Sequence, residues 1–346
     1  MSAFIDNSAE KKGKIFCGKQ CIDVGWIADN SEAIVIVSPK NSEEIEEQLN
    51  HIGRKYINGE TILQAYYFTP CIKEEGDLRA VTPFNHYESP YPDIIEIHEK
   101  SEEIFNKGKR VLDIEFNVNR QLELARQMES IDVIPWENDP CKKYRYYYNN
   151  DWFGKGSADV LYYMMRIIRP QRIIEVGSGF STAVMLDTNN SCFQNEIEIH
   201  AIEPNPERLK SLLRDRDNLT IHECTLQSMP FSFFEQLQEN DILFIDSSHV
   251  SKVNSDVNYY LFEIFPRIAK GVYIHFHDFF YPFIYPKEWI FEGKAYSEMY
   301  LIRAFLMNNE HYTIQFFGEM LQNELPDKLS IKLKSIAGSL WIRKEL

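Results

Sequence analysis

Three short clusters of glycine, acidic and histidine residues follow apolar runs of this 346-residue chain. They are EVGSG at 175–179, DSSH at 246–249 and HFHD at 275–278. Glycines spaced as in the first cluster let the backbone turn sharply and approach a ligand, and a helix that follows presents free amides to an anionic group. Carboxylates and imidazoles, as in the other two, take up protons and bind divalent cations. The clusters therefore predict a ligand site with acid–base or metal chemistry.

An acidic residue ends the next apolar run, IEIHAIEP, at Glu203. An acid at the tip of a second strand can accept both hydroxyls of a ribose, so the ligand is expected to be a nucleoside-containing cofactor. A tight turn without any ligand is the alternative for Gly177 and Gly179. An NAD(P)-linked oxidoreductase uses the same turn, but Thr182 occupies the place of its third glycine, and that class does not explain DSSH.

Two carboxylates, Asp246 and Asp278, are expected at neighbouring strand ends. Unpaired, they would repel each other and raise each other's pKa, and a metal ion or a cationic cofactor relieves this. Period-two alternation places His275 and His277 on one face of a strand with Asp278 at its tip. His275 is more typical of a core histidine than of a ligand.

The elements that position these clusters alternate between strand and helix from residue 172 onward. The apolar runs lie at 172–176, 197–203, 219–224, 241–246, 271–276, 312–317 and 339–343. Helical patterns such as PERLKSLLRDR and VNSDVNYYLFEIFPRI separate most of them. This order predicts an α/β fold with a Rossmann-like, mostly parallel sheet, helices on both faces, and ligands at the carboxyl ends of the strands.

The residues before 171 do not show this alternation of strands and helices. Residues 1–110 predict a small α+β accessory domain, 111–170 a helical linker and aromatic lid, and 171–346 the cofactor-binding domain. Helices are expected over 117–130 and 157–168, with Ser157 as the N-cap of the second.

An aromatic segment at 279–306 follows the third cluster and predicts either a lid over an acceptor pocket or a packed cap. The same two alternatives, a lid or a packed cap, apply to Tyr148, Trp152 and Phe153. In the segment at 279–306, Glu298 and Arg303 are expected either to orient an acceptor or to pair on a helix surface.

Composition limits the partners. A formal net charge of −15 argues against a broad nucleic-acid-binding face, and no run reaches the ~20 apolar residues that span a bilayer. The N-terminus carries no hydrophobic signal core, so a cytoplasmic location is expected. The six cysteines have no paired spacing and are interpreted as free thiols. A small-molecule partner fits this composition, and a homo-oligomer stays open.

These motifs together resemble the class I S-adenosylmethionine-dependent methyltransferases over residues 145–346. The similarity is greatest to bacterial metal-assisted O-methyltransferases of sugars and secondary metabolites, which carry an Asp-x-x-His motif. The resemblance implies a seven-stranded sheet whose last strand inserts antiparallel.

The resemblance also implies a cofactor site for S-adenosyl-L-methionine. Its methionine part is expected against the residues of the glycine turn, which are Glu175, Gly177, Gly179 and Ser181. Its ribose is expected at Glu203, and its adenine is expected to be flanked by Leu226 and Gln227; Asp246 is a further expected contact of the cofactor.

For catalysis, the resemblance implies that Asp246 and Asp278 bind Mg²⁺ or another divalent cation, with His277 as a third ligand and His249 as the general base. Related enzymes often have an acid where this chain has His277, which leaves the ion open. The activity implied is O-methylation of a small hydroxylated acceptor, a saccharide or a secondary metabolite. Metal-free methylation of nitrogen or of a carboxyl group, and a non-catalytic cofactor-binding module, are the alternatives.

Overall fold

The computed structural model describes residues 87–346 apart from 107, 109–110, 133, 330–332 and 334–337, together with short pieces before residue 87. The chain divides into two compact units, Met1–Pro92 and Asp93–Leu346, so the division falls earlier than the boundary expected at 110. In the first unit, β1 (Phe4–Ile5), β2 (Ile15–Phe16) and β3 (Lys19–Ile22) form one small sheet, and β4 (Val35–Val37) pairs with β5 (Tyr56–Asn58). Most of the other residues predicted for the accessory domain before residue 87 lie outside the described residues, and residues 93–110 belong to the second unit.

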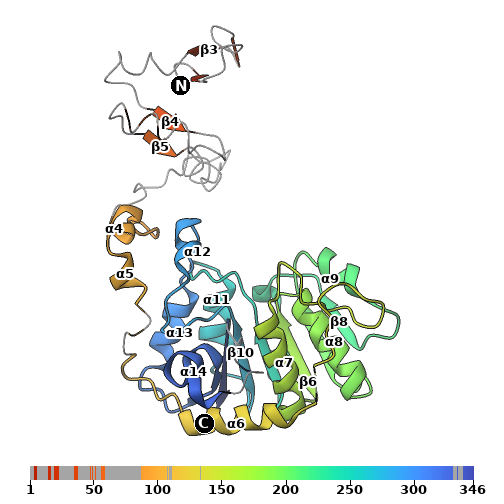
Figure 1. Ribbon diagram of the computed structural model, residues 1–346. Helices are drawn as coiled ribbons and strands as arrows, with labels where there is room; N and C mark the ends of the chain where they lie inside the picture. Colours follow the sequence, from red (N-terminus) through yellow and green to blue (C-terminus); the bar gives the residue numbers. More distant parts are fainter. Residues whose placement is uncertain are drawn as a thin grey trace. The chain divides into compact units, whose positions relative to one another are not determined.

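A seven-stranded sheet forms the centre of the second unit, with the order β11-β12-β10-β9-β6-β7-β8 (Figure 1). The strands are β6 (Arg172–Val176), β7 (Glu198–Ile202), β8 (Leu219–His222), β9 (Ile242–Ile245), β10 (Tyr273–His277), β11 (Tyr312–Phe317) and β12 (Ser339–Lys344). Every strand pair is parallel except those of β12, which runs antiparallel between β10 and β11. The predicted fold and the antiparallel last strand are confirmed.

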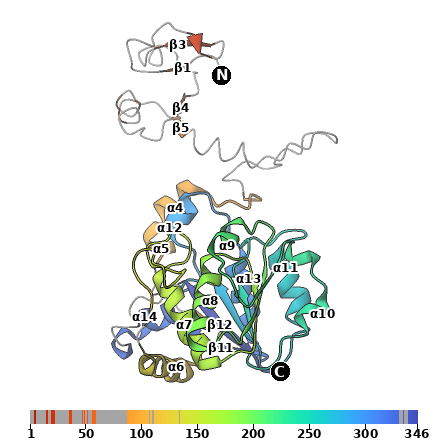
Figure 2. The same ribbon diagram turned by 90° about the vertical axis from the view of Figure 1, so that its right-hand side faces the viewer.

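Burial explains why these segments form strands in the middle of the sheet. All residues of β9 and β10 are buried, and β6 and β7 expose only their first residue partly. Strands covered on both faces need continuous apolar runs rather than alternation. In Figure 2, α7 and α8 lie on one side of the strands and α10 and α11 on the other, so helices cover both faces.

The helices of the second unit connect the strands or flank them. They are α4 (Ile94–Glu99), α5 (Ser101–Ile104), α6 (Val118–Ser130), α7 (Lys155–Ile168), α8 (Phe180–Cys192), α9 (Glu207–Leu212), α10 (Phe231–Phe234), α11 (Asp256–Tyr259), α12 (Lys287–Phe291), α13 (Glu298–Leu306) and α14 (Gly318–Glu324). Short 3₁₀ turns follow at η1 (Leu226–Ser228) and η3 (Pro326–Lys328), and η2 (Tyr260–Ile264) is a π-turn. Among the described residues, no helix is both long enough and apolar enough to cross a bilayer.

Two helix predictions need correction. Helix α7 begins earlier than expected, with Gly154 as its N-cap, and Ser157 lies buried inside its first turn. The helix expected over 253–268 is short, because α11 gives way after four residues to the π-turn η2. A π-turn rotates the following side chains relative to a regular helix, and such turns are frequent at functional sites. Here it begins at Tyr260, whose side chain is fully buried.

Candidate active site

The glycine turn joins the ends of three strands. Gly177 has a φ of +75°, and a Cβ added there would lie 2.1 Å from the carbonyl oxygen of Asp246. Its amide donates to the carbonyl of Ile202 at 3.1 Å, while the amide of Asp246 donates to the carbonyl of Val176 at 2.9 Å. Only glycine fits this conformation and this close approach, so the turn sets the spacing of the carboxyl ends of β6, β7 and β9.

Beneath the turn lies a buried acid. Glu175 is fully buried and accepts hydrogen bonds from the hydroxyls of Ser181 at 2.6 Å and Thr182 at 2.5 Å. Burial raises the pKa of Glu175 to about 8, although both hydroxyls oppose the shift. The structure therefore places Glu175 and Ser181 under the glycine turn, where they fix the first turn of α8, rather than along the groove described next.

A groove of about 380 Å³ runs along the carboxyl ends of the strands. Five residues expected at the cofactor line it, namely Gly177, Glu203, Leu226, Gln227 and Asp246. The carboxylate of Glu203 accepts the amide of Ser178 at 3.1 Å on one oxygen and the amide of Asn205 at 2.8 Å on the other. Each oxygen of a carboxylate has a second lone pair, so both can still accept a hydroxyl.

Replacing Glu203 with alanine is expected to weaken binding of S-adenosylhomocysteine by about 10- to 100-fold, because a hydrogen bond to a charged group contributes about 1.5–3 kcal/mol. Calorimetric titration measures the affinity. Glu207→Ala is the matched control, since it removes an exposed acid of the next helix, outside the groove. Equal affinities of the two variants would contradict the role of Glu203.

The predicted acidic and histidine residues come together at the carboxyl ends of β9 and β10. One ligand atom each from Asp246, His277 and Asp278 lies within 4.8 Å of the others. Nε2 of His249 lies 3.6 Å from Asp246 Oδ1 and 3.7 Å from Asp278 Oδ2. The cluster adjoins the groove, because Asp246 belongs to both.

Two residues of this cluster have left-handed backbone conformations, with φ of +58° at His249 and +59° at Asp278. Such conformations are uncommon outside glycine and persist where the surrounding structure holds them. The amide of His249 donates to the hydroxyl of Ser247 at 3.0 Å, and that of Asp278 to the carbonyl of Gly338 at 2.7 Å. Both side chains are therefore aimed by a constrained backbone.

His275 belongs to the core, unlike His277, which belongs to the Asp/His cluster. Its ring is fully buried and stacks on Phe244 with 4.0 Å between centroids. Burial lowers its pKa well below the ordinary value, and the nearby His277 adds to this effect. The rings of His275 and His277 stack 6.2 Å apart on the same face, as the alternation predicts. The interpretation of His275 as a core histidine is confirmed.

His249 is surrounded by carboxylates. Burial opposes its charged form, but the negative charges of Asp246 and Glu298, together with the hydrogen bond to Glu298, outweigh this and hold the pKa of His249 well above its ordinary value. Glu298 is itself buried, and its carboxylate lies 2.7 Å from Nδ1 of His249. The alternative that Glu298 pairs on a helix surface is therefore wrong.

Aromatic side chains border the cluster. The ring of Phe153 lies 4.9 Å from that of His277, and the ring of Tyr296 lies 5.0 Å from that of His249. Tyr296 also contacts Trp289, edge to face, at 5.7 Å. Phe153 is buried, whereas Tyr296 and Trp289 are partly exposed, so these two form an accessible wall beside His249. Within the aromatic segment, Tyr285 and its buried neighbours belong instead to the packed cap.

Beside the glycine turn, the structure pairs two residues that the sequence did not indicate as a pair. The guanidinium of Arg208 lies 3.5 Å above the ring of Trp152, which is 59% exposed. The Cδ atom of Arg208 is 3.3 Å from the position that a Cβ on Gly179 would take. Neither a motif nor a spacing indicates this pair, because 56 positions separate its members and only the fold brings them together.

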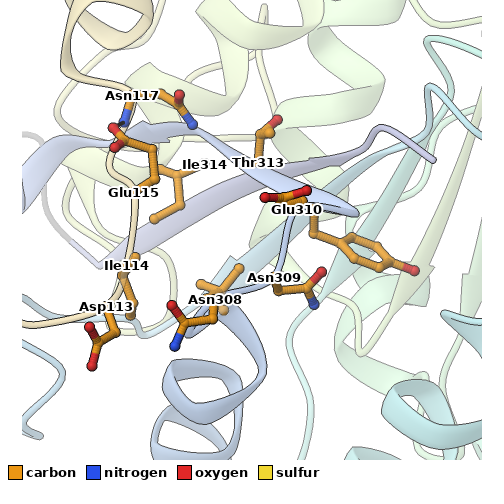
Figure 3. Close-up of a pocket in the computed structure, with 11 residues that line it drawn as sticks. Asp113, Ile114, Glu115, Asn117, Asn308, Asn309, Glu310, Thr313 and Ile314 are labelled. Carbon is orange, nitrogen blue, oxygen red and sulfur yellow. Dashed lines mark hydrogen bonds between the residues drawn. The ribbon is translucent and has the colours of Figure 1, made fainter.

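A second hollow, of about 490 Å³, lies away from this chemistry. Figure 3 shows the carboxylates of Asp113, Glu115 and Glu310 around it. It adjoins the first residues of β11, and the strand register places these at the amino-terminal edge of the parallel strands. The groove and the Asp/His cluster lie at the opposite edge.

The sheet order, the glycine turn and the acid at the second strand define a class I methyltransferase arrangement. Residues 174–279 match a family described as a methyltransferase domain. An uncharacterised protein of Archaeoglobus fulgidus is 35% identical over 176 residues, which cover 49% of this chain and 79% of that protein.

The solved structures to which this chain is similar include two methyltransferases. PaMTH1 of Podospora anserina, bound to S-adenosylhomocysteine, has 14% identity and a TM-score of 0.40 over 78% of this chain and 100% of its own. The O-methyltransferase TomG of Streptomyces achromogenes, bound to S-adenosylmethionine, has 11% identity and a TM-score of 0.37 over 73% of this chain and 96% of its own. The chain belongs to the class I S-adenosylmethionine-dependent methyltransferases.

Proposed function

We propose that this protein transfers the methyl group of S-adenosylmethionine to a hydroxyl of a small-molecule acceptor, with a divalent cation at Asp246, His277 and Asp278. One observation carries the proposal. The imidazole of His249 faces the carboxylates of Asp246 and Asp278, at 3.6 and 3.7 Å, beside a groove lined by five of the residues expected at the cofactor. A candidate base, a candidate ion site and a candidate cofactor groove thus lie together at the carboxyl ends of the parallel strands.

The donor set of the cluster fits a divalent ion. It combines two carboxylates with an imidazole, and Nε2 of His277 lies 3.3 Å from Oδ1 of Asp278. Carboxylates suit Mg²⁺ and Mn²⁺, whereas imidazole favours first-row transition ions. The mixture supports Mn²⁺ or a similar ion more than Mg²⁺. A divalent ion there supplies Lewis acidity that makes an acceptor hydroxyl easier to deprotonate.

The chain's own residues account for the remaining steps. The raised pKa of His249 belongs to the ion-free cluster, where Asp246 favours its charged form; a divalent ion would compensate that carboxylate and favour an unprotonated Nε2. Nε2 then accepts the proton of the acceptor hydroxyl while the new C–O bond forms and the C–S bond of the sulfonium breaks, which leaves S-adenosylhomocysteine. Tyr296 and Trp289 offer flat faces to the acceptor and hold its ring near His249. Such alignment of an acceptor oxygen with the methyl group supplies much of the acceleration in a displacement of this kind.

An assay with methyl-labelled S-adenosylmethionine tests the function. Hydroxylated sugars, phenols, amines and carboxylic acids serve as acceptors. We expect labelled ethers from hydroxyl compounds. Labelled amines or base-labile esters alone would contradict O-methylation and favour the alternative acceptor atoms.

Removal of the metal is expected to abolish most turnover with the best acceptor of that panel. Treatment with EDTA followed by dialysis provides the metal-free protein, and Mn²⁺ should restore more activity than Mg²⁺, because one ligand is an imidazole. The measurement is the initial rate at matched concentrations of each ion. Full activity in EDTA would exclude a role for the ion and support metal-free transfer.

A further inference from the structure

Glu298, the first residue of α13, is 1% exposed and carries three hydrogen bonds on its carboxylate. One oxygen accepts the hydroxyls of Ser247 at 2.7 Å and Tyr260 at 2.6 Å. The other lies 2.7 Å from Nδ1 of His249. A buried carboxylate with this many donors is fixed in place, and its charge is compensated by hydrogen bonds.

The contact determines which nitrogen of His249 carries a proton. An ionised carboxylate only accepts hydrogen bonds, so Nδ1 must be the donor toward Glu298. Nε2 is then the nitrogen that faces Asp246 and Asp278, at 3.6 and 3.7 Å. The ring is thus oriented with one nitrogen toward the protein interior and the other toward the candidate reaction site.

The same helix also holds the backbone of His249. Its carbonyl accepts hydrogen bonds from the amides of Ser297 at 2.9 Å and Glu298 at 3.1 Å. These bonds help to retain the left-handed conformation of His249. The start of α13 therefore fixes both the main chain and the ring of a residue 49 positions earlier.

We propose that Glu298 is a positioning residue for methyl transfer, which keeps the proton of His249 on Nδ1 and so leaves Nε2 to act on the acceptor. This inference rests on the proposed function of His249 as the base.

Glu298→Gln is the test variant and Tyr260→Phe its control. Glutamine has nearly the same shape but lacks the charge. Its single oxygen cannot accept from Ser247, from Tyr260 and from Nδ1 of His249 as the two carboxylate oxygens do, so the hydrogen bond that Nδ1 donates is weakened. Phenylalanine at 260 removes one hydrogen bond to the carboxylate and leaves the pair between Glu298 and His249 intact. A purely structural role would make the two variants behave alike.

Nuclear magnetic resonance of protein with ¹⁵N-labelled histidine, saturated with S-adenosylhomocysteine, gives a readout that needs no acceptor. We expect a downfield proton on Nδ1 of His249 in the wild type, an upfield shift of it in Glu298→Gln, and little change in Tyr260→Phe. The absence of that proton in the wild type, or the same signal in wild type and Glu298→Gln, would overturn the inference.

Kinetics provide the second readout. Glu298→Gln is expected to lower kcat by about 10- to 100-fold, while the KM for the acceptor and the affinity for S-adenosylhomocysteine stay near wild type. An equal loss of kcat in Tyr260→Phe would overturn the positioning role. Failure of the proposed function gives a different result. In that case His249→Ala would leave turnover unchanged, whatever happens to the Nδ1 proton signal in Glu298→Gln.

Discussion

His249→Ala is expected to lower kcat by about 10²- to 10⁴-fold, the usual contribution of a general base. The affinity for S-adenosylhomocysteine should stay near wild type, because the groove is lined by Gly177, Glu203 and their neighbours and does not include His249. Turnover of the best acceptor and calorimetric titration measure the two quantities on the same preparation.

His311→Ala is the control for this loss. His311 is exposed and precedes β11, at the far edge of the sheet from the Asp/His cluster. His311→Ala should leave both kcat and the affinity for S-adenosylhomocysteine unchanged. Wild-type turnover in His249→Ala would remove this residue from the mechanism, and a loss confined to cofactor affinity would assign it to binding instead.

The largest expected effect on cofactor affinity comes from Gly177→Ala. The added Cβ would lie 2.1 Å from the carbonyl oxygen of Asp246, and the backbone at φ +75° disfavours alanine. Left-handed strain together with overpacking is expected to lower the free energy of unfolding by about 2–4 kcal/mol. Because relief of the clash must separate the ends of β6 and β9, the affinity for S-adenosylhomocysteine should fall by about 100-fold or more, a loss of about 2.7 kcal/mol.

Gly154→Ala is the matched control. The N-cap residue Gly154 has a φ of −65°, and a Cβ there would meet no atom within 4 Å. This variant should unfold and bind like wild type. Chemical denaturation and calorimetric titration provide the comparison, and a Gly177→Ala protein with wild-type affinity would show that the turn does not shape the groove.

The sheet could be predicted from the sequence because strands buried on both faces are continuous apolar runs, which are visible in the sequence. The runs at 172–176 and 312–317 coincide with β6 and β11, and the other five differ from their strands by a few end residues. The positions of Glu203, Asp246 and Asp278 follow directly, since the carboxyl ends of parallel strands share one edge. Alternation within β10 likewise placed His275 and His277 on one face, and only His277 lies at the end of the strand, next to Asp278.

Contacts between distant elements were not predictable in the same way. Glu298 begins a helix, where an acid is common for reasons of the helix dipole alone, so its contact with His249 leaves no trace in the sequence. The π-turn at Tyr260 depends on packing, and a regular helical pattern hides it. Ser157 satisfied the usual N-cap preference, yet α7 begins at Lys155, because helix ends depend on local backbone geometry as well as residue type.

The proposed metal-assisted transfer is tested most directly by calorimetric titration of Mn²⁺ into protein saturated with S-adenosylhomocysteine, for wild type and Asp278→Asn. The account predicts one ion per wild-type chain and a marked loss of ion affinity in Asp278→Asn, with S-adenosylhomocysteine still bound by both. The absence of Mn²⁺ binding in the wild type, or equal binding in Asp278→Asn, would contradict a metal site at Asp246, His277 and Asp278.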